Sequence, residues 1–161
     1  MRNKKGERGF TLIELLVVIG IIALLSTLAV FSLNSARKKS RDAKRLADVR
    51  QIQTALELYY DDQKEYPSYS GVLGSQCLVN TITGFETSGT SACGSGAGII
   101  YMGFVPSDPD NDSRTKYGYT ATGSEVTSYE IRFRLEAPTA GLPGAQDICA
   151  SPNGLGPCPT N

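Results

Sequence analysis

The sequence contains no histidine, the side chain that most often serves as general base and metal ligand near neutral pH. This absence argues against a hydrolase that depends on imidazole and against a typical zinc site. The sequence also shows no glycine loop for phosphate and no nucleophile–base pair. We therefore expect a protein that is not an enzyme and that requires no cofactor.

Net charge is also absent, because 16 Lys and Arg balance 16 Asp and Glu, but the distribution is uneven. Residues 1–50 carry 11 basic side chains against 4 acidic ones, whereas residues 51–161 carry 5 against 12. Such a split indicates that the two parts face different surroundings. The acidic part lacks the basic patch that nucleic-acid binding needs, so the sequence disfavours DNA as a partner without ruling it out.

Residues 15–36 form a run of 22 residues without a charged side chain. At about 1.5 Å per residue, a helix of this length spans about 33 Å, enough to cross a hydrocarbon core of about 30 Å. A cleaved secretory signal would need a cleavage site of small residues after the run, and the following residues do not form one. The run is also too long and too uniformly apolar for a buried core helix. We predict a membrane-spanning helix.

Basic residues flank this run on both sides. Residues 1–9 carry four basic side chains against one acidic side chain, which favours a cytoplasmic N-terminus. Residues 37–50 carry 7 basic and 2 acidic side chains, which by the same rule would favour the cytoplasm for the opposite flank. The flanking charges therefore do not decide the orientation.

One carboxylate, Glu14, lies at the start of the apolar segment. Such a residue is costly in a membrane, so it either extends to the nearby headgroups or has a function. The surrounding segment, KKGERGFTLIELLVVIGIIALL, resembles the leader of type IV pilins and of the pseudopilins of type II secretion and competence systems. The positions that conform are Gly9, Phe10, Thr11, Leu12, Ile13 and Glu14.

The resemblance implies that a membrane-embedded aspartyl peptidase removes residues 1–9 by cutting after Gly9 on the cytoplasmic side. Phe10 would then become the N-terminal residue and be N-methylated. Its freed amine could pair with Glu14 of a neighbouring subunit among packed apolar helices, where a missed partner leaves a buried charge. Glu14 would thereby set the axial register of a filament.

The resemblance also implies a location and partners. Before assembly the chain would be a single-pass protein of the inner (cytoplasmic) membrane, with its N-terminus in the cytoplasm and its head outside. Its partners would be membrane lipid, prepilin peptidase and an inner-membrane assembly platform, then copies of itself and other pilin-like subunits. The assembled filament would be periplasmic or on the cell surface.

Residues 10–36 would thus be the transmembrane half of a long helix and residues 37–66 its amphipathic half. Tyr66 is expected to end the helix, because Pro67 disfavours the helical conformation in the residue before it. The basic residues 37–45 are either a solvated face or a contact with lipid headgroups or acidic surfaces of adjacent subunits. The apolar stripe predicted to hold a globular head consists of Leu46, Val49, Ile52, Leu56 and Tyr59.

Residues 67–161 are predicted to form the head. Residues 68–98 are rich in Gly, Ser and Thr and predict a long loop with at most short structured pieces near residues 78–82. Residues 117–136 predict a hairpin of two strands, 117–122 and 128–136, and the second strand alternates apolar and charged side chains. The fold class is α+β: a pilin fold with a long N-terminal helix and a small antiparallel β-sheet head.

Four cysteines follow the apolar run, which suggests disulfides in an exported domain: Cys77, Cys93, Cys149 and Cys158. Three connectivities are possible. We favour the local one, 77 with 93 and 149 with 158, because each bond would close a loop rich in Gly, Ser or Pro. Buried free thiols are the alternative.

Asp108, Asp110 and Asp112 alternate in a segment that resembles the Pro-Asp-Pro stretch of the major type II secretion pseudopilin, where a nearby loop holds calcium. Carboxylates at this spacing offer the oxygen ligands that calcium takes. The pattern is not an EF-hand, because Ser113 and Tyr119 stand where Gly and Glu would be needed. A calcium site and an acidic turn shaped by proline are the two interpretations.

The leading function is structural: a subunit of a type IV pilus-like or type II secretion pseudopilus filament. The alternative is a low-abundance tip or minor pilin that acts as a ligand- or DNA-binding module, with residues 68–98 as its binding surface. The leader does not separate pilus, secretion and DNA-uptake systems, because these share it.

Overall fold

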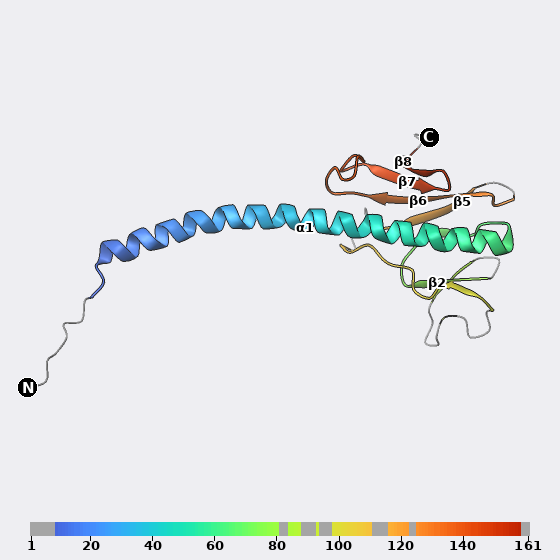
Figure 1. Cartoon of the computed structure of the whole chain (residues 1–161), viewed down its shortest axis with the longest axis horizontal. Coiled ribbons are helices and arrows are strands. Elements are labelled where there is room, and N and C mark those ends of the chain that lie inside the picture. Colours follow the sequence, from blue (N-terminus) through green and yellow to red (C-terminus); the bar gives the residue numbers. More distant parts are fainter. Residues whose placement is uncertain are drawn as a thin grey trace, which may run out of the picture. The chain divides into compact units, whose positions relative to one another are not determined.

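The computed structural model describes residues 9–80, 84–87, 93, 98–110, 116–122 and 125–158 (Figure 1). Within these residues, helix α1 (Leu12–Gln63) is followed by eight short strands, so the fold is α+β as predicted. The chain forms two compact units, Met1–Arg37 and Lys38–Asn161.

The first unit contains the apolar part of α1. Every Leu, Ile, Val and Phe from Leu12 to Leu33 is exposed, between 47% and 83% of its surface. By length and composition this helix is able to cross a membrane. Burying apolar surface is the largest favourable contribution to folding and association, so a surface of this kind calls for a cover of lipid or other apolar helices.

The second unit contains the amphipathic part of α1, and the predicted apolar stripe is confirmed. Each of its five side chains is at most 7% exposed: Leu46, Val49, Ile52, Leu56 and Tyr59. The helix ends at Gln63 rather than at the predicted Tyr66. Lys64 takes a positive φ of 62°, and its N–H donates to the carbonyl of Tyr60 at 2.8 Å, which closes the helix by a left-handed cap before Pro67 acts.

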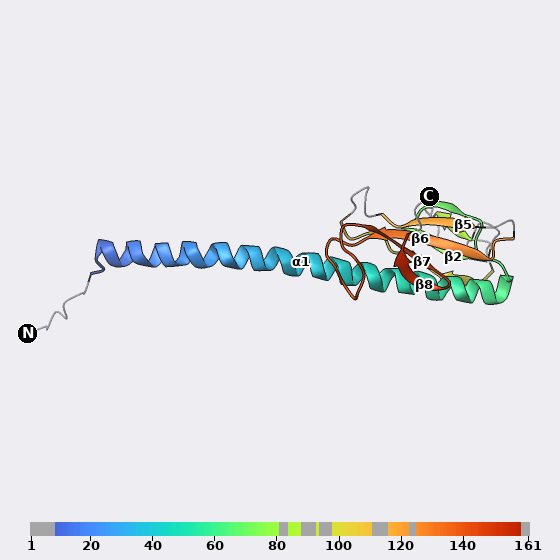
Figure 2. The ribbon, with the colours of Figure 1, turned by 90° about the horizontal axis from the view of Figure 1, so that it is seen from above.

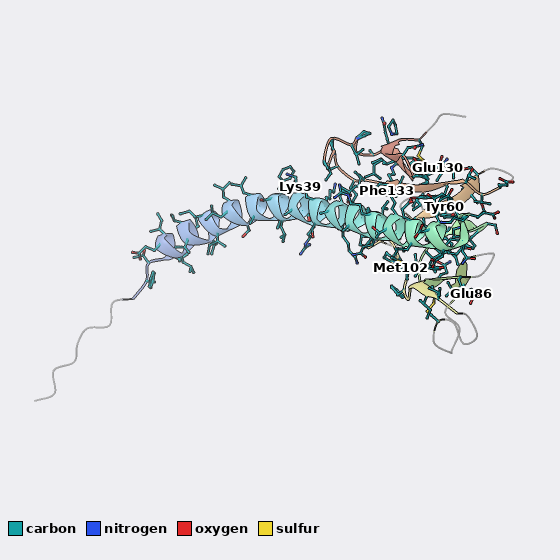
Figure 3. The ribbon with its side chains drawn as sticks, turned by 45° about the vertical axis from the view of Figure 1, so that its right-hand side comes forward. Lys39, Tyr60, Glu86, Met102, Glu130 and Phe133 are labelled. Carbon is teal, nitrogen blue, oxygen red and sulfur yellow. A yellow bond between two sulfur atoms is a disulfide. The ribbon has the colours of Figure 1, made fainter. Side chains whose placement is uncertain are left out.

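Five antiparallel strands form the larger sheet, in the order β1-β5-β6-β7-β8 (Figures 1 and 2). They are β1 (Ser70–Val72), β5 (Gly118–Thr122), β6 (Ser128–Arg134), β7 (Asp147–Ser151) and β8 (Gly154–Pro157). The predicted hairpin is present as β5 and β6, with Tyr119 opposite Ile131. The predicted alternation of β6 is also confirmed, because Tyr129, Ile131 and Phe133 are buried and Arg132 is exposed. Figure 3 shows Phe133 between this sheet and α1.

A second, three-stranded sheet corrects the prediction for residues 68–98, a long loop in which short structured pieces were expected only near residues 78–82. Its strands, in the order β3-β2-β4, are β2 (Gln76–Val79), β3 (Phe85–Thr87) and β4 (Ile100–Met102). Together with β1, three strands therefore begin inside the predicted loop. These strands are only three or four residues long and are flanked by segments rich in Gly and Ser, so their sequences cannot show the alternation of apolar and polar residues that predicts a strand. In β2, Cys77, Leu78 and Val79 are nevertheless buried.

Aromatic contacts join the helix and both sheets into one core. Tyr59 of α1 packs edge-to-face on Tyr101 of β4, with ring centroids 5.3 Å apart. Phe85 of β3 packs on Tyr119 of β5 at 5.0 Å in the same manner. Such pairs contribute about 0.5–1.5 kcal/mol beyond the area that they bury. The two sheets are thereby held on the same stretch of helix.

Gly84 offers a test of this packing. Its φ is +71°, and a Cβ at this position would lie 2.4 Å from Cβ of Pro67. We predict that Gly84→Ala lowers the free energy of unfolding by about 2–4 kcal/mol, through left-handed strain and overpacking together. Urea unfolding in detergent, followed by tyrosine fluorescence, measures this loss. Gly103→Ala is the control, because a Cβ there meets no atom within 4 Å. Equal stabilities of the two variants would contradict the packing described.

Candidate functional site

The start of α1 contains the segment singled out by the sequence. Thr11 precedes the first helical residue and forms a reciprocal cap with Glu14. The Thr11 N–H donates to Oε2 of Glu14 at 2.8 Å, and the Thr11 hydroxyl donates to the same oxygen at 2.6 Å. In return, the Glu14 N–H donates to Oγ1 of Thr11 at 3.3 Å. This is a capping box, which satisfies two backbone donors that the helix leaves without partners.

Sequence reasoning missed this role of Glu14, although the signal was present. Thr11 followed three residues later by Glu14, ahead of an apolar run, is the typical pattern of a capping box. A carboxylate in the first turn also interacts favourably with the positive end of the helix dipole. Glu14 therefore stabilises the beginning of its own helix, whatever it contacts in an assembly.

Gly9 and Phe10 lie immediately before the cap. A Cβ added to Gly9 would meet no atom within 4 Å, and its backbone does not adopt a positive φ. Phe10 is 86% exposed. Neither packing nor backbone strain within the described residues therefore requires glycine at position 9. A requirement for it would have to come from a molecule that binds this segment.

A second cluster, buried in the head, is built around Arg45. The side chains of Arg45, Asp42 and Asp108 are fully buried. Arg45 donates to both carboxylate oxygens of Asp108, at 2.6 and 3.1 Å, and to Asp42 at 2.8 Å. It also donates to Glu136 at 2.9 Å. Arg41 then holds Glu136 with two bonds of 2.6 Å. We call these five residues the Arg45 cluster.

The electrostatics of the Arg45 cluster favour its charged state. Burial opposes the charge of Arg45, but its hydrogen bonds to three carboxylates outweigh that penalty and raise its pKa. Hydrogen bonds from Arg41, and next from Arg45, lower the pKa of Glu136 to about 2 against the opposing effect of burial. Asp42 additionally accepts the backbone N–H groups of Glu136 and Ala137, which follow strand β6. The cluster thus fixes the end of β6 to α1.

This cluster changes the interpretation of the basic residues 37–45. Two of them, Arg41 and Arg45, turn inward and pair with carboxylates of the head rather than facing solvent or lipid. Arg37, Lys38, Lys39 and Lys44 remain exposed. Local sequence could not reveal the inward pair, because Asp108 and Glu136 lie 63 and 91 residues beyond Arg45.

Asp108 takes a different role from the calcium ligand that we considered. Both of its carboxylate oxygens bond to Arg45, and Oδ1 also accepts the Asp110 N–H at 2.9 Å. A cation would compete there with a buried guanidinium. Asp112 lies outside the described residues, so calcium binding through the remaining carboxylates stays a prediction. Glu130, Cys149 and Cys158 also lie close enough together to share a metal ion, but the two cysteines are joined in a disulfide and offer no thiolate ligands.

The cysteines form two disulfides, Cys77–Cys93 and Cys149–Cys158, and none is free. This is the local pairing that we favoured. The first bond attaches residue 93 to β2, and the second attaches residue 158 to β7. Closing loops of 16 and 9 residues removes conformational entropy mainly from the unfolded chain.

Comparison with known proteins adds to these observations. Residues 4–30 match the family described as the prokaryotic N-terminal methylation motif. The type II secretion system core protein G of Escherichia coli (strain K12) is 38% identical over 68 residues, which cover 42% of this chain and 47% of that protein. The chain therefore spans about half the length of this relative. No solved structure gives a significant match.

Two other relatives align over more of the chain. The type IV major fimbrial protein FimA of Dichelobacter nodosus is 30% identical over 122 residues, which cover 75% of this chain and 78% of that protein. The core protein G of Vibrio cholerae is 29% identical over 149 residues, covering 92% of this chain and 94% of the relative.

Motif, fold and relatives together define a class of proteins with a methylation motif at the start of a long apolar helix and an α+β head. The chain belongs to the family of type IV pilins and type II secretion pseudopilins. Its apolar N-terminal helix fits membrane anchoring before assembly, and the known members that it resembles are structural subunits.

The Arg45 cluster can be tested by removing its central charge. We predict that Arg45→Met, which keeps much of the volume, lowers the free energy of unfolding by about 3–5 kcal/mol, because it leaves buried carboxylates without their partner. Urea unfolding of the full chain in detergent measures the loss. Arg50→Met is the matched control on the exposed side of α1 and should change stability by less than about 0.5 kcal/mol. Equal effects would contradict the cluster.

Glu136 predicts a dependence of stability on pH. Its pKa is about 2 in the folded chain and 4.5 ordinarily, so its ionised form stabilises the fold above pH 4.5, and this contribution is lost as pH falls to about 2. Glu136→Gln should therefore be less stable than the wild type at neutral pH, and the difference should close between these two pH values. Thermal unfolding from pH 2 to 7 measures this, with exposed Glu125→Gln as the control. A difference that does not change with pH would refute the assignment.

Proposed function

We propose that this chain is the precursor of a structural filament subunit, which a prepilin peptidase cleaves after Gly9 and which assembles through its N-terminal helix. The observation that carries this proposal is the capped, exposed apolar helix whose beginning lies within the methylation motif. Relatives named as a type II secretion system core protein and as a type IV major fimbrial protein support the same structural role.

Cleavage would give the start of the helix a positive charge. Removal of residues 1–9 frees the amine of Phe10, one residue before the capping Thr11. Both side-chain bonds of the cap use Oε2 of Glu14, and within the described residues no bond uses Oε1. Glu14 can therefore accept the amine of a neighbouring subunit through Oε1 and keep its own helix capped.

An ion pair between Glu14 of one subunit and the Phe10 amine of a neighbour would fix the axial register of the two helices. In a bundle of apolar helices, an amine or a carboxylate without its partner is a buried charge, so misaligned subunits are penalised strongly. Phe10 would be N-methylated after the cut, which keeps the amine basic. Before assembly the chain would lie in the inner membrane with its head outside. Its partners in that membrane would be the peptidase and an assembly platform.

Glu14→Gln separates the two roles of this residue. Glutamine also completes a capping box, so the variant should keep the helix start and the cut after Gly9 but lose the ion pair. In a host with prepilin peptidase we expect normal cleavage on immunoblots and a yield of sheared filaments lower by at least about tenfold. Thr11→Ala is the complementary control, because it removes half of the cap and keeps the charge.

The proposal predicts that the Thr11→Ala subunit assembles normally and that the Glu14→Gln subunit gives the lowered filament yield. Normal filaments from Glu14→Gln would refute the ion pair. Absence of cleavage in the wild-type chain by an active peptidase would refute the proposed function as a whole.

A further inference from the structure

The outward face of α1 in the second unit carries charge of opposite sign at its two ends. Three exposed lysines at the beginning of this part are called the basic segment: Lys39 and Lys44 on the outward face, and Lys38, which is exposed although it lies in line with the buried Asp42 and Arg45 at steps of four and three residues. Three exposed carboxylates near its end, Glu57, Asp61 and Asp62, are called the acidic segment. The acidic residues of this part, Asp42 and Asp48, are buried; Asp42 is held by Arg45, and Asp48 interacts electrostatically with Lys44.

Contacts inside the chain leave both segments charged. Within the described part of the chain, Lys38 and Lys39 have no ion pair, and Figure 3 shows Lys39 on α1 away from the strands. In the acidic segment, Glu57 and Asp62 accept hydrogen bonds from the hydroxyls of Tyr66 and Tyr101, which bring no opposing charge. Asp61 pairs with Lys64 at 3.3 Å, but both are highly exposed.

Between the two segments, this helix face carries mostly small or uncharged side chains. Facing outward at steps of three and four residues are Ser40, Ala43, Ala47, Gln51 and Thr54, all of them exposed. None of these five is a bulky apolar residue, but the exposed Arg50 lies beside them, and Leu58, 55% exposed, comes next at the same spacing within the acidic segment. A second helix can still approach this face along those five positions, and the charges at the two ends decide its position.

Distance excludes pairing of the two segments within one chain. Lys39 and Asp61 are 22 residues apart on a single helix, which corresponds to about 33 Å. A complementary surface of the right spacing is present on another copy of the same chain. Membrane insertion gives all copies the same direction, so the copies meet as parallel helices.

We propose that the basic segment of one subunit binds the acidic segment of a second copy, with the two helices parallel and shifted by about 30 Å along their axes. This inference rests on the proposed filament. The neighbour differs from the one that would pair with Glu14, because Glu14 and Phe10 are four residues apart and require a shift of only about 6 Å. The two contacts together would fix two different neighbours of each subunit.

Zero-length cross-linking of purified wild-type filaments tests the contact directly. A carbodiimide joins lysine to carboxylate only where they touch, and tryptic peptides identify the joined residues by mass spectrometry. We expect cross-links between Lys38 or Lys39 and Glu57, Asp61 or Asp62, which at this spacing can form only between subunits. The pair Lys64 and Asp61, 3.3 Å apart in one chain, is the internal positive control. Filaments that yield the control cross-link alone would overturn the proposal.

Reversing the charges of the two segments provides a second, independent test. Lys38→Glu with Lys39→Glu, and separately Asp61→Lys with Asp62→Lys, should each lower filament yield by about fivefold or more, and the four changes together should restore it. Reversal of two exposed charges away from α1, Lys116→Glu with Arg132→Glu, is the control and should leave the yield unchanged. Immunoblots for the cut after Gly9 show in each case whether the subunit is processed.

Two outcomes would overturn the pairing while leaving the proposed function intact. Normal yields from both double variants would show that the segments are merely solvated. Low yields without recovery in the fourfold variant would show that the lysines contact something else, such as anionic lipid headgroups. Failure of the wild-type chain to be cut or to form filaments would instead refute the proposed function.

Discussion

The rest of this structure depends on one constraint: exposing the apolar surface of the first half of α1 to water is unfavourable in free energy. From Leu12 to Leu33 no large apolar side chain is buried by the chain itself, so the fold is complete only when lipid or other helices cover this surface. A polar group placed in this segment must therefore have a partner. Glu14 obtains one from its own helix through Thr11, and it retains an oxygen that can bind another subunit. Membrane anchoring and the proposed assembly into a filament both depend on this one surface.

The head solves a different problem, because it must be attached to α1 firmly enough for the helix to carry it. The apolar stripe from Leu46 to Tyr59 packs in one core cluster with buried residues of both sheets. The Arg45 cluster adds geometric definition, since a guanidinium with fixed donors accepts only one arrangement of three carboxylates. The cluster also explains why two of the basic residues that follow the apolar segment, Arg41 and Arg45, are present. Counted as free charges, these basic residues would favour a cytoplasmic location for the head.

Sequence patterns predicted the parts of the fold in which a period repeats often enough to be recognised. The amphipathic stripe and the alternation of β6 are of this kind, and both are present. Strand β2 was expected only as a short structured piece near residues 78–82, and β1 and β3 were missed, because three or four residues cannot show a period. The helix end was misplaced because a lysine adopts the left-handed cap. The Arg45 cluster joins residues far apart in the chain, which no local pattern displays. The capping box, in contrast, was visible in the order Thr11 to Glu14 and could have been predicted.

The central claim is that the chain is cut after Gly9 to create the N-terminus from which a filament is built. Intact-mass and N-terminal peptide measurements on protein purified from the membrane of its native host test this most directly. The account predicts a chain that has lost residues 1–9 and begins with an N-methylated Phe10. A chain that retains Met1 in a strain with active prepilin peptidase would contradict it.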